Sequence, residues 1–136
     1  MADSGVLRLM RIALCLALLA TSATADDRSA FYGSWGTAEQ CSGTPIKPGG
    51  TVMATPIEID DTFLRQGQIW CRLSWGSVEQ RPAGPATTAL AQCGEDNVRI
   101  YQIGLGSTGA SLTIRWDFPL TNGPLGRCDV GLSGDG

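Results

Sequence analysis

The chain has 136 residues, the length of one modest domain, and it carries 10 Lys and Arg against 13 Asp and Glu, no His and five Cys. Its formal net charge of −3 and its lack of any basic run disfavour nucleic acid as a partner, because nucleic-acid binding draws most of its affinity from a basic surface. The absence of His removes the commonest general base and the commonest metal ligand. We therefore expect a protein that is not an enzyme and that holds no cofactor and no metal ion.

The first 25 residues have the features of a secretory signal peptide. Arg8 and Arg11 give a positive start, residues 12–20 form an uninterrupted apolar run, and Ala23-Thr24-Ala25 offers a small-x-small cleavage pattern. The apolar run is far shorter than the roughly 20 residues that span a bilayer. The sequence therefore predicts an exported protein, periplasmic or extracellular, with no stable membrane span.

Short strands separated by turns rich in Gly and Pro are expected along the rest of the chain. About seven strands are predicted, at residues 33–41, 52–59, 68–75, 87–93, 98–105, 112–118 and 127–130. Leu112, Ile114, Trp116 and Phe118 share one face of the clearest strand, and Ile69, Cys71, Leu73 and Trp75 share one face of another. This pattern is typical of an all-β domain, a small antiparallel β-barrel or sandwich, over residues 26–130, with a flexible tail at 131–136.

Four cysteines follow the cleavage point, an even number in a chain bound for an oxidising compartment, and we expect two disulfides. Three connectivities are possible, and the sequence does not choose among them. We favour Cys71 with Cys93, which would join neighbouring strands, and Cys41 with Cys128, which would tie the first strand to the last. The wide spacings lack the close Cys-x-x-Cys pairs of a structural zinc site.

The acidic cluster next to a predicted strand consists of Glu58, Asp60 and Asp61. Glu58 and Asp60 would project from one face about 7 Å apart, and paired carboxylates at such a separation could serve glycoside hydrolysis. Asp-Asp also favours a turn through its own hydrogen bonds. The enzyme alternative is therefore a cell-wall or carbohydrate hydrolase that uses these surface carboxylates.

A Gly-rich motif at residues 104–109, Gly-Leu-Gly-Ser-Thr-Gly, matches G-x-G-x-x-G and follows a predicted strand. A phosphate-binding loop of this kind must lead into a helix, whereas here a strand begins at Leu112. We therefore predict that the motif is a flexible hairpin connection.

The four tryptophans are Trp35, Trp70, Trp75 and Trp116. Core packing accounts for Trp75 and Trp116, which share a face with apolar neighbours. Trp70 is predicted to face outward next to Arg72, and exposed Trp and Arg are enriched in interfaces. Trp70 and Arg72 are therefore our candidate contact residues.

Residues 31–41 place a G-x-W motif, Gly33 to Trp35, ahead of Cys41. This segment resembles the opening strand of small exported bacterial β-barrels of lipocalin-like build, among them periplasmic inhibitors of secreted metalloproteases. The resemblance implies a barrel whose floor Gly33 and Trp35 help to close. The chain departs from the inhibitor pattern in its two predicted disulfides, where one is expected, and in the short segment Asp26–Ala30 ahead of the motif.

These observations together predict a secreted or periplasmic, non-catalytic binding module. Its partner would be a protein or a small ligand contacted by loops and outward aromatic residues, and the resemblance adds an inhibitor-like small barrel as one form of it. Two alternatives remain open: the hydrolase described above, and a structural envelope protein with a packed interior and no ligand.

Overall fold

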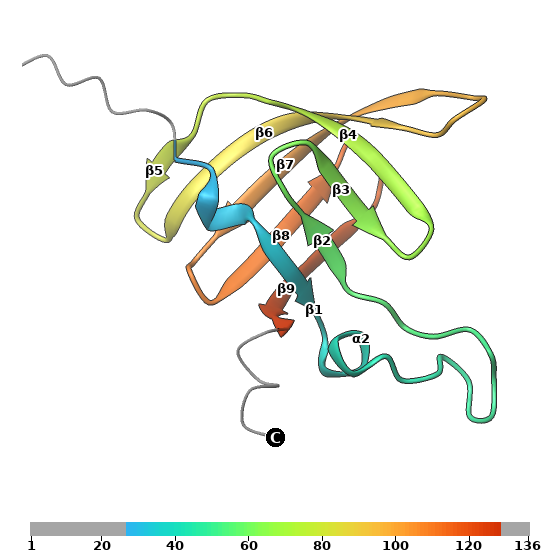
Figure 1. Ribbon diagram of the computed structural model, residues 1–136. Coiled ribbons are helices and arrows are strands. Elements are labelled where there is room, and N and C mark those ends of the chain that lie inside the picture. Colours follow the sequence, from blue (N-terminus) through green and yellow to red (C-terminus); the bar gives the residue numbers. More distant parts are fainter. Residues whose placement is uncertain (1–26, 129–136) are drawn as a thin grey trace, which may run out of the picture.

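Eight antiparallel strands close into a barrel in the computed structural model, which describes residues 27–128 (Figure 1). The elements in chain order are the 3-10 helix η2 (Ser29–Phe31), β1 (Gly33–Gly36), α2 (Ala38–Ser42), β2 (Ile57–Ile59), β3 (Phe63–Gln66), β4 (Ile69–Trp75), β5 (Glu79–Arg81), β6 (Gly84–Cys93), β7 (Arg99–Ser107), β8 (Ser111–Trp116) and β9 (Thr121–Arg127). The all-β prediction is confirmed, in its barrel form. The predicted signal peptide and C-terminal tail lie outside the described residues.

The strands form a ring in which almost every strand pairs with its neighbours in the chain, in the order β1-β2-β3-β4-β6-β7-β8-β9. The ring closes where β9 pairs with β1, through the register pairs Trp35 with Arg127 and Gly36 with Gly126. β5 is the extra strand: it pairs with residues 84–86 of β6, which precede the residues 89–93 that pair with β4. Because the connections alternate between the two ends of the barrel, the loops fall into two separate groups.

The first predicted strand ends earlier than expected, because a helix replaces its second half. β1 stops at Gly36, and Thr37 caps α2: its hydroxyl accepts from the Gln40 amide at 3.3 Å, and the Gln40 side chain accepts from the Thr37 amide at 2.8 Å. Gly43 ends the helix at φ 67°, a left-handed conformation that favours Gly. A Thr-x-x-Gln capping box followed by Gly was the local signal that the prediction missed.

Other boundaries also differ from the prediction. The strand expected at 52–59 is restricted to β2, since residues 43–56 form a connection with one isolated bridge, Pro45 with Met53. The last described strand is β9, a segment predicted as a turn because of its Gly and Pro residues, and residues 129 and 130 of the strand expected at 127–130 lie outside the described residues. β3 and β5 were not predicted, because each is short and together they bury only Leu64. Pairing with β4, β6 and β8 holds β3, β5 and β9, respectively, in the sheet.

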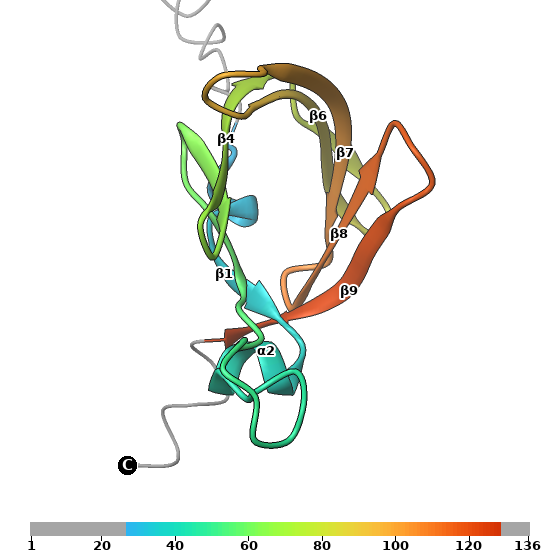
Figure 2. The ribbon, with the colours of Figure 1, turned by 90° about the vertical axis from the view of Figure 1, so that its right-hand side faces the viewer.

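The core fills the barrel from inside the ring, and η2 lies within the ring when the barrel is viewed nearly along its axis (Figure 2). The buried residues of the core are Phe31, Trp35, Ile57, Ile59, Leu64, Cys71, Leu73, Ala89, Ala91, Ile103, Leu105, Leu112, Ile114 and Leu125. The Trp35 indole donates to the Phe31 carbonyl at 3.1 Å, and the Arg127 guanidinium lies 4.1 Å from the centre of the Trp35 ring. Arg127 also donates to the carbonyls of Tyr32 and Ala30, so this side chain fixes the N-terminal segment to the barrel.

Both predicted disulfides are present. Cys71 and Cys93 are direct register partners on β4 and β6. Cys41 and Cys128 link α2 to the residue after β9, next to the β1–β9 closure. The second bridge starts from the helix that follows the first strand, and not from the strand itself.

Candidate functional site

Large apolar side chains are exposed at one end of the barrel, the end where α2 follows β1. Of the nine such residues among 27–128, only Leu90 lies elsewhere. We name the other eight the apolar rim: Ile46, Val52, Met53, Ile69, Val98, Ile100, Phe118 and Leu120. They come from the connection before β2, the start of β4, the β6–β7 turn with the start of β7, and the β8–β9 turn, which all lie on the right-hand side of Figure 1. Large exposed apolar patches typically mark interaction sites.

An open groove of about 640 Å³ lies within this end. Ile46 and Met53 line it from the connection before β2, Ile69 lines it from β4, and Thr121 to Gly123 line it from β9. The groove brings together residues that are far apart in sequence, since Ile46 and Gly123 line the same hollow.

Three aromatic side chains form a cluster beside the groove. The ring centres of Tyr101, Trp116 and Phe118 lie 5.3–5.8 Å apart. The Trp116 indole donates to the Asn122 side chain at 2.7 Å, and this hydrogen bond connects the cluster to the groove wall. Trp75 and Trp116 were both expected in the core, and both are half-buried at its edge, Trp75 at the opposite end of the barrel against Phe31. Ile69 and Phe118, which were expected on the same buried faces, are exposed because Ile69 begins β4 next to a turn and Phe118 lies in the β8–β9 turn.

The predicted contact residues Trp70 and Arg72 lie on the outer face of β4, next to the rim residue Ile69. Trp70 is half-buried because its ring packs edge-on against Phe63 of β3, at 5.6 Å between ring centres. The guanidinium groups of Arg72 and Arg65 lie 5.6 Å and 4.8 Å from the centre of the Phe63 ring. We name these four residues, Phe63, Arg65, Trp70 and Arg72, the Phe63 patch.

The Phe63 patch could be found only in part from the sequence. Register pairs place Phe63 opposite Arg72 and Arg65 opposite Trp70, but β3 was not predicted, so its two members were missed. Among residues 27–128 the one ion pair joins Arg81 and Glu79, so Arg65 and Arg72 form none, although Glu58 is the register partner of Arg65. The patch therefore presents aromatic surface flanked by two guanidinium groups.

The carboxylates considered for hydrolysis are arranged differently from a catalytic pair. Asp60 accepts from the backbone amides of Phe63 at 2.6 Å and Thr62 at 2.8 Å, which closes the β2–β3 turn. These hydrogen bonds hold the pKa of Asp60 below its ordinary value, whereas the general acid of a glycosidase needs a raised pKa. Glu58 projects from β2 opposite Arg65. Asp60 is thus placed to stabilise a turn.

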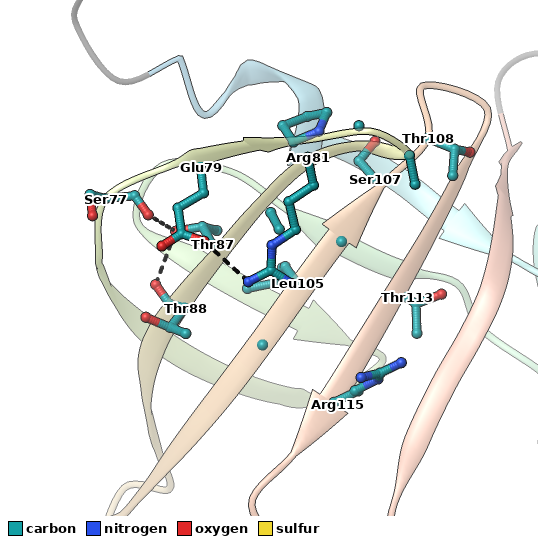
Figure 3. Close-up of a pocket in the computed structure, with 16 residues that line it drawn as sticks. Ser77, Glu79, Arg81, Thr87, Thr88, Leu105, Ser107, Thr108, Thr113 and Arg115 are labelled. Atoms are coloured by element: carbon teal, nitrogen blue, oxygen red, sulfur yellow. Dashed lines mark hydrogen bonds and ion pairs between the residues drawn. The ribbon is translucent and has the colours of Figure 1, made fainter.

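The Gly-rich motif at 104–109 contributes to a second hollow, of about 420 Å³, on the outer wall (Figure 3). The prediction that this motif is a hairpin connection is wrong for Gly104 and Gly106, which lie within β7. Gly109, at φ 89°, is the motif's glycine in the turn between β7 and β8.

Two further observations concern the described part of the chain. Residues 27–128 contain no group of three or more Cys, Asp or Glu that could hold a metal ion. No helix within that range is long and apolar enough to cross a membrane.

Comparisons of the chain with protein-family models, curated proteins and solved structures give no match.

Proposed function

We propose that this chain is an exported, non-catalytic binding module that recognises a protein partner through the apolar rim and the adjoining Phe63 patch. The observation that carries the proposal is the segregation of exposed apolar side chains: eight of the nine among the described residues lie at one end of the barrel. An even scatter of such residues would need no explanation. Their concentration around a groove supports a surface that is covered when a partner binds.

Composition favours a protein over a lipid surface. The charges next to the rim residues are of both signs, Glu95, Asp96 and Asp117 together with Lys47 and Arg99, whereas an anionic lipid surface is typically bound by a cluster of basic residues. Trp and Arg, which the Phe63 patch supplies, are the residues most enriched at the energetic centres of protein interfaces. A protein partner suits both features.

The N-terminal segment of the barrel is unsuited to the role of an inserting arm. The Ala30 carbonyl accepts from Arg127 at 3.2 Å and from the Ser107 hydroxyl at 3.4 Å, and Phe31 is completely buried. Residues 30–32 are thus fixed to the end opposite the rim. If the resemblance to protease inhibitors reflects a shared function, we expect the rim, and not residues 30–32, to contact the protease.

The test is affinity capture from the exported fraction of the source cells with a matched set of variants. We expect the disulfide-bonded protein and Leu90→Ser to capture the same partner, because Leu90 is exposed but lies outside the rim. Ile69→Ser and Trp70→Ala should lose it. Capture that is equal for all four proteins would contradict the proposal. If the unaltered protein elutes as a dimer in size-exclusion chromatography and Ile69→Ser elutes as a monomer, the partner is a second copy of the chain.

The hydrolase alternative has its own test. Turnover of cell-wall or other polysaccharide substrates by the purified protein, abolished by Asp60→Asn, would replace the binding function with catalysis. The structural alternative predicts that no variant of the rim changes any interaction.

A further inference from the structure

The hollow on the outer wall is a trough with a floor of backbone (Figure 3). Two rows of register partners cross it: Thr88, Gly104 and Arg115 form one row, and Ala86, Gly106 and Thr113 form the next. β6 and β8 lie about 10 Å apart on either side of β7, so their side chains form two walls above the glycines. Glu79 of β5 pairs with Ala86, so β5 extends the second row. The side chains of β5 form a further wall of the trough beside β6.

The two glycines of the floor are explained by neither backbone geometry nor packing. Neither Gly104 nor Gly106 has a positive φ, and a Cβ atom built on either would meet no heavy atom within 4 Å. Glycine in the interior of a strand costs stability, and it often marks a place where a ligand or another backbone approaches closely. A side chain at either position would occupy the trough.

The trough has a guanidinium group at one end of its floor. Arg115 lies opposite Gly104 and forms no ion pair, whereas Arg81 and Glu79, which line the trough from β5, form the one ion pair of the described residues at 3.1 Å. Hydroxyl groups line the walls, from Ser77, Thr88, Thr108 and Thr113. A ligand that fits must therefore carry an anionic end and a body with hydrogen-bonding groups.

The dimensions select a slender ligand. From Gly104 to Thr108 the floor extends about 13 Å along the chain, which is the length of three to four extended residues. A floor one strand wide that carries no side chain accepts another backbone, and hydroxyls on both walls can pair with its amide groups. We propose that this trough binds the C-terminal residues of an extended polypeptide, with the terminal carboxylate on the Arg115 guanidinium and the segment running over Gly106 toward the β5–β6 hairpin.

The probe is N-acetyl-Ala-Ala-Ala, compared with the same peptide carrying a C-terminal amide. Both are titrated into the ¹⁵N-labelled, disulfide-bonded protein, and the amide resonances of the trough are followed by NMR. We expect saturable shifts at Gly104 and Gly106 with the free carboxylate. The amide peptide should bind about tenfold more weakly or worse, because it lacks the charge-assisted hydrogen bonds to Arg115.

Three variants make the test independent of misfolding. Gly106→Val should keep or raise Tm, since open space surrounds the position and β-branched residues favour strands, and yet it should abolish the shift at Gly104. Arg115→Gln should lower the affinity of the carboxylate peptide to that of the amide. Gln102→Thr, on the same strand but outside the trough, should bind as the unaltered protein does.

Three results would each overturn the proposal: equal affinity for the two peptides, undiminished binding by Gly106→Val, or no shift at the trough glycines with the peptide at tens of millimolar. The site is separate from the apolar rim. Loss of partner capture by Ile69→Ser therefore tests the proposed function alone, and these titrations test the trough alone.

Discussion

Removal of the Cys41–Cys128 disulfide should destabilise the protein more than removal of Cys71–Cys93. The chain-entropy model relates the cost to the length of the closed loop. The sequence separations are 87 and 22, which correspond to about 4.6 and about 3.4 kcal/mol. A small domain has a total stability of roughly 5–15 kcal/mol, so loss of the longer bridge removes a large part of it.

The structure adds a second reason for the difference. The β1–β9 closure next to Cys41–Cys128 has only two register pairs, whereas β4 and β6, which Cys71–Cys93 joins, share five. Without its disulfide the closure should open locally, before the rest of the barrel unfolds. The remaining strands would keep their pairing.

The assay compares urea unfolding of the double variants Cys41→Ala/Cys128→Ala and Cys71→Ala/Cys93→Ala. Amide hydrogen exchange then locates the opening: the amides of Trp35 and Gly36 should lose protection in the first variant, while those of β6 and β7 keep it. A larger loss of stability in the second variant would refute the reasoning, because each variant replaces one buried cysteine, Cys128 or Cys71, and so carries a similar packing cost. So would exchange that rises equally throughout the first variant.

Three further predictions concern single side chains. Arg127→Ala should lower the free energy of unfolding, measured in urea, by about 2–4 kcal/mol. Arg127 donates to the carbonyls of Ala30, Tyr32 and Gly109, and its guanidinium covers the Trp35 ring. A loss of stability no larger than that caused by Arg115→Ala, on the outer wall, would contradict this role. Asp60→Asn should weaken the fall in stability at acid pH, because the pKa of Asp60 is lower in the folded than in the unfolded protein. The carboxylate therefore stabilises the fold above the unfolded pKa, and this contribution is lost as pH falls through the folded pKa. If the urea midpoints of the variant and the unaltered protein change equally from pH 5 to pH 2, the turn gains nothing from the carboxylate. Thr37→Ala should cost about 1 kcal/mol by loss of the N-cap of α2, measured against Thr108→Ala, whose hydroxyl caps no helix.

Much of the fold could be predicted where the pattern was local. Alternation placed Leu112 and Ile114 on the buried face of β8, and Cys71 and Leu73 on the buried face of β4. The parity and compartment of the cysteines predicted two bridges, and both pairings are those we favoured. These features follow from the two-residue period of a strand and from the chemistry of cysteine, which each segment carries in itself.

The candidate site was predicted only at Trp70 and Arg72, because its other members depend on neighbours in space. Phe63 and Arg65 belong to a short strand whose amphipathic pattern is too weak to detect, and they meet Trp70 and Arg72 through register. Gly106 reads as a turn residue in the sequence, but it lies in a strand held by β6 and β8 on both sides.

The sequence by itself determined the strand-rich class, the inward faces of the central residues of β4 and β8 and the expectation of two covalent links, since these depend on residue type and on spacing within a segment. Only the tertiary structure decided which loops share an end of the barrel, and so gathered the apolar rim from four separate segments. It also opened the trough over Gly104 and Gly106. The physical reason is that closure and register are set by the sum of many pairings around the ring, and no single segment encodes that sum.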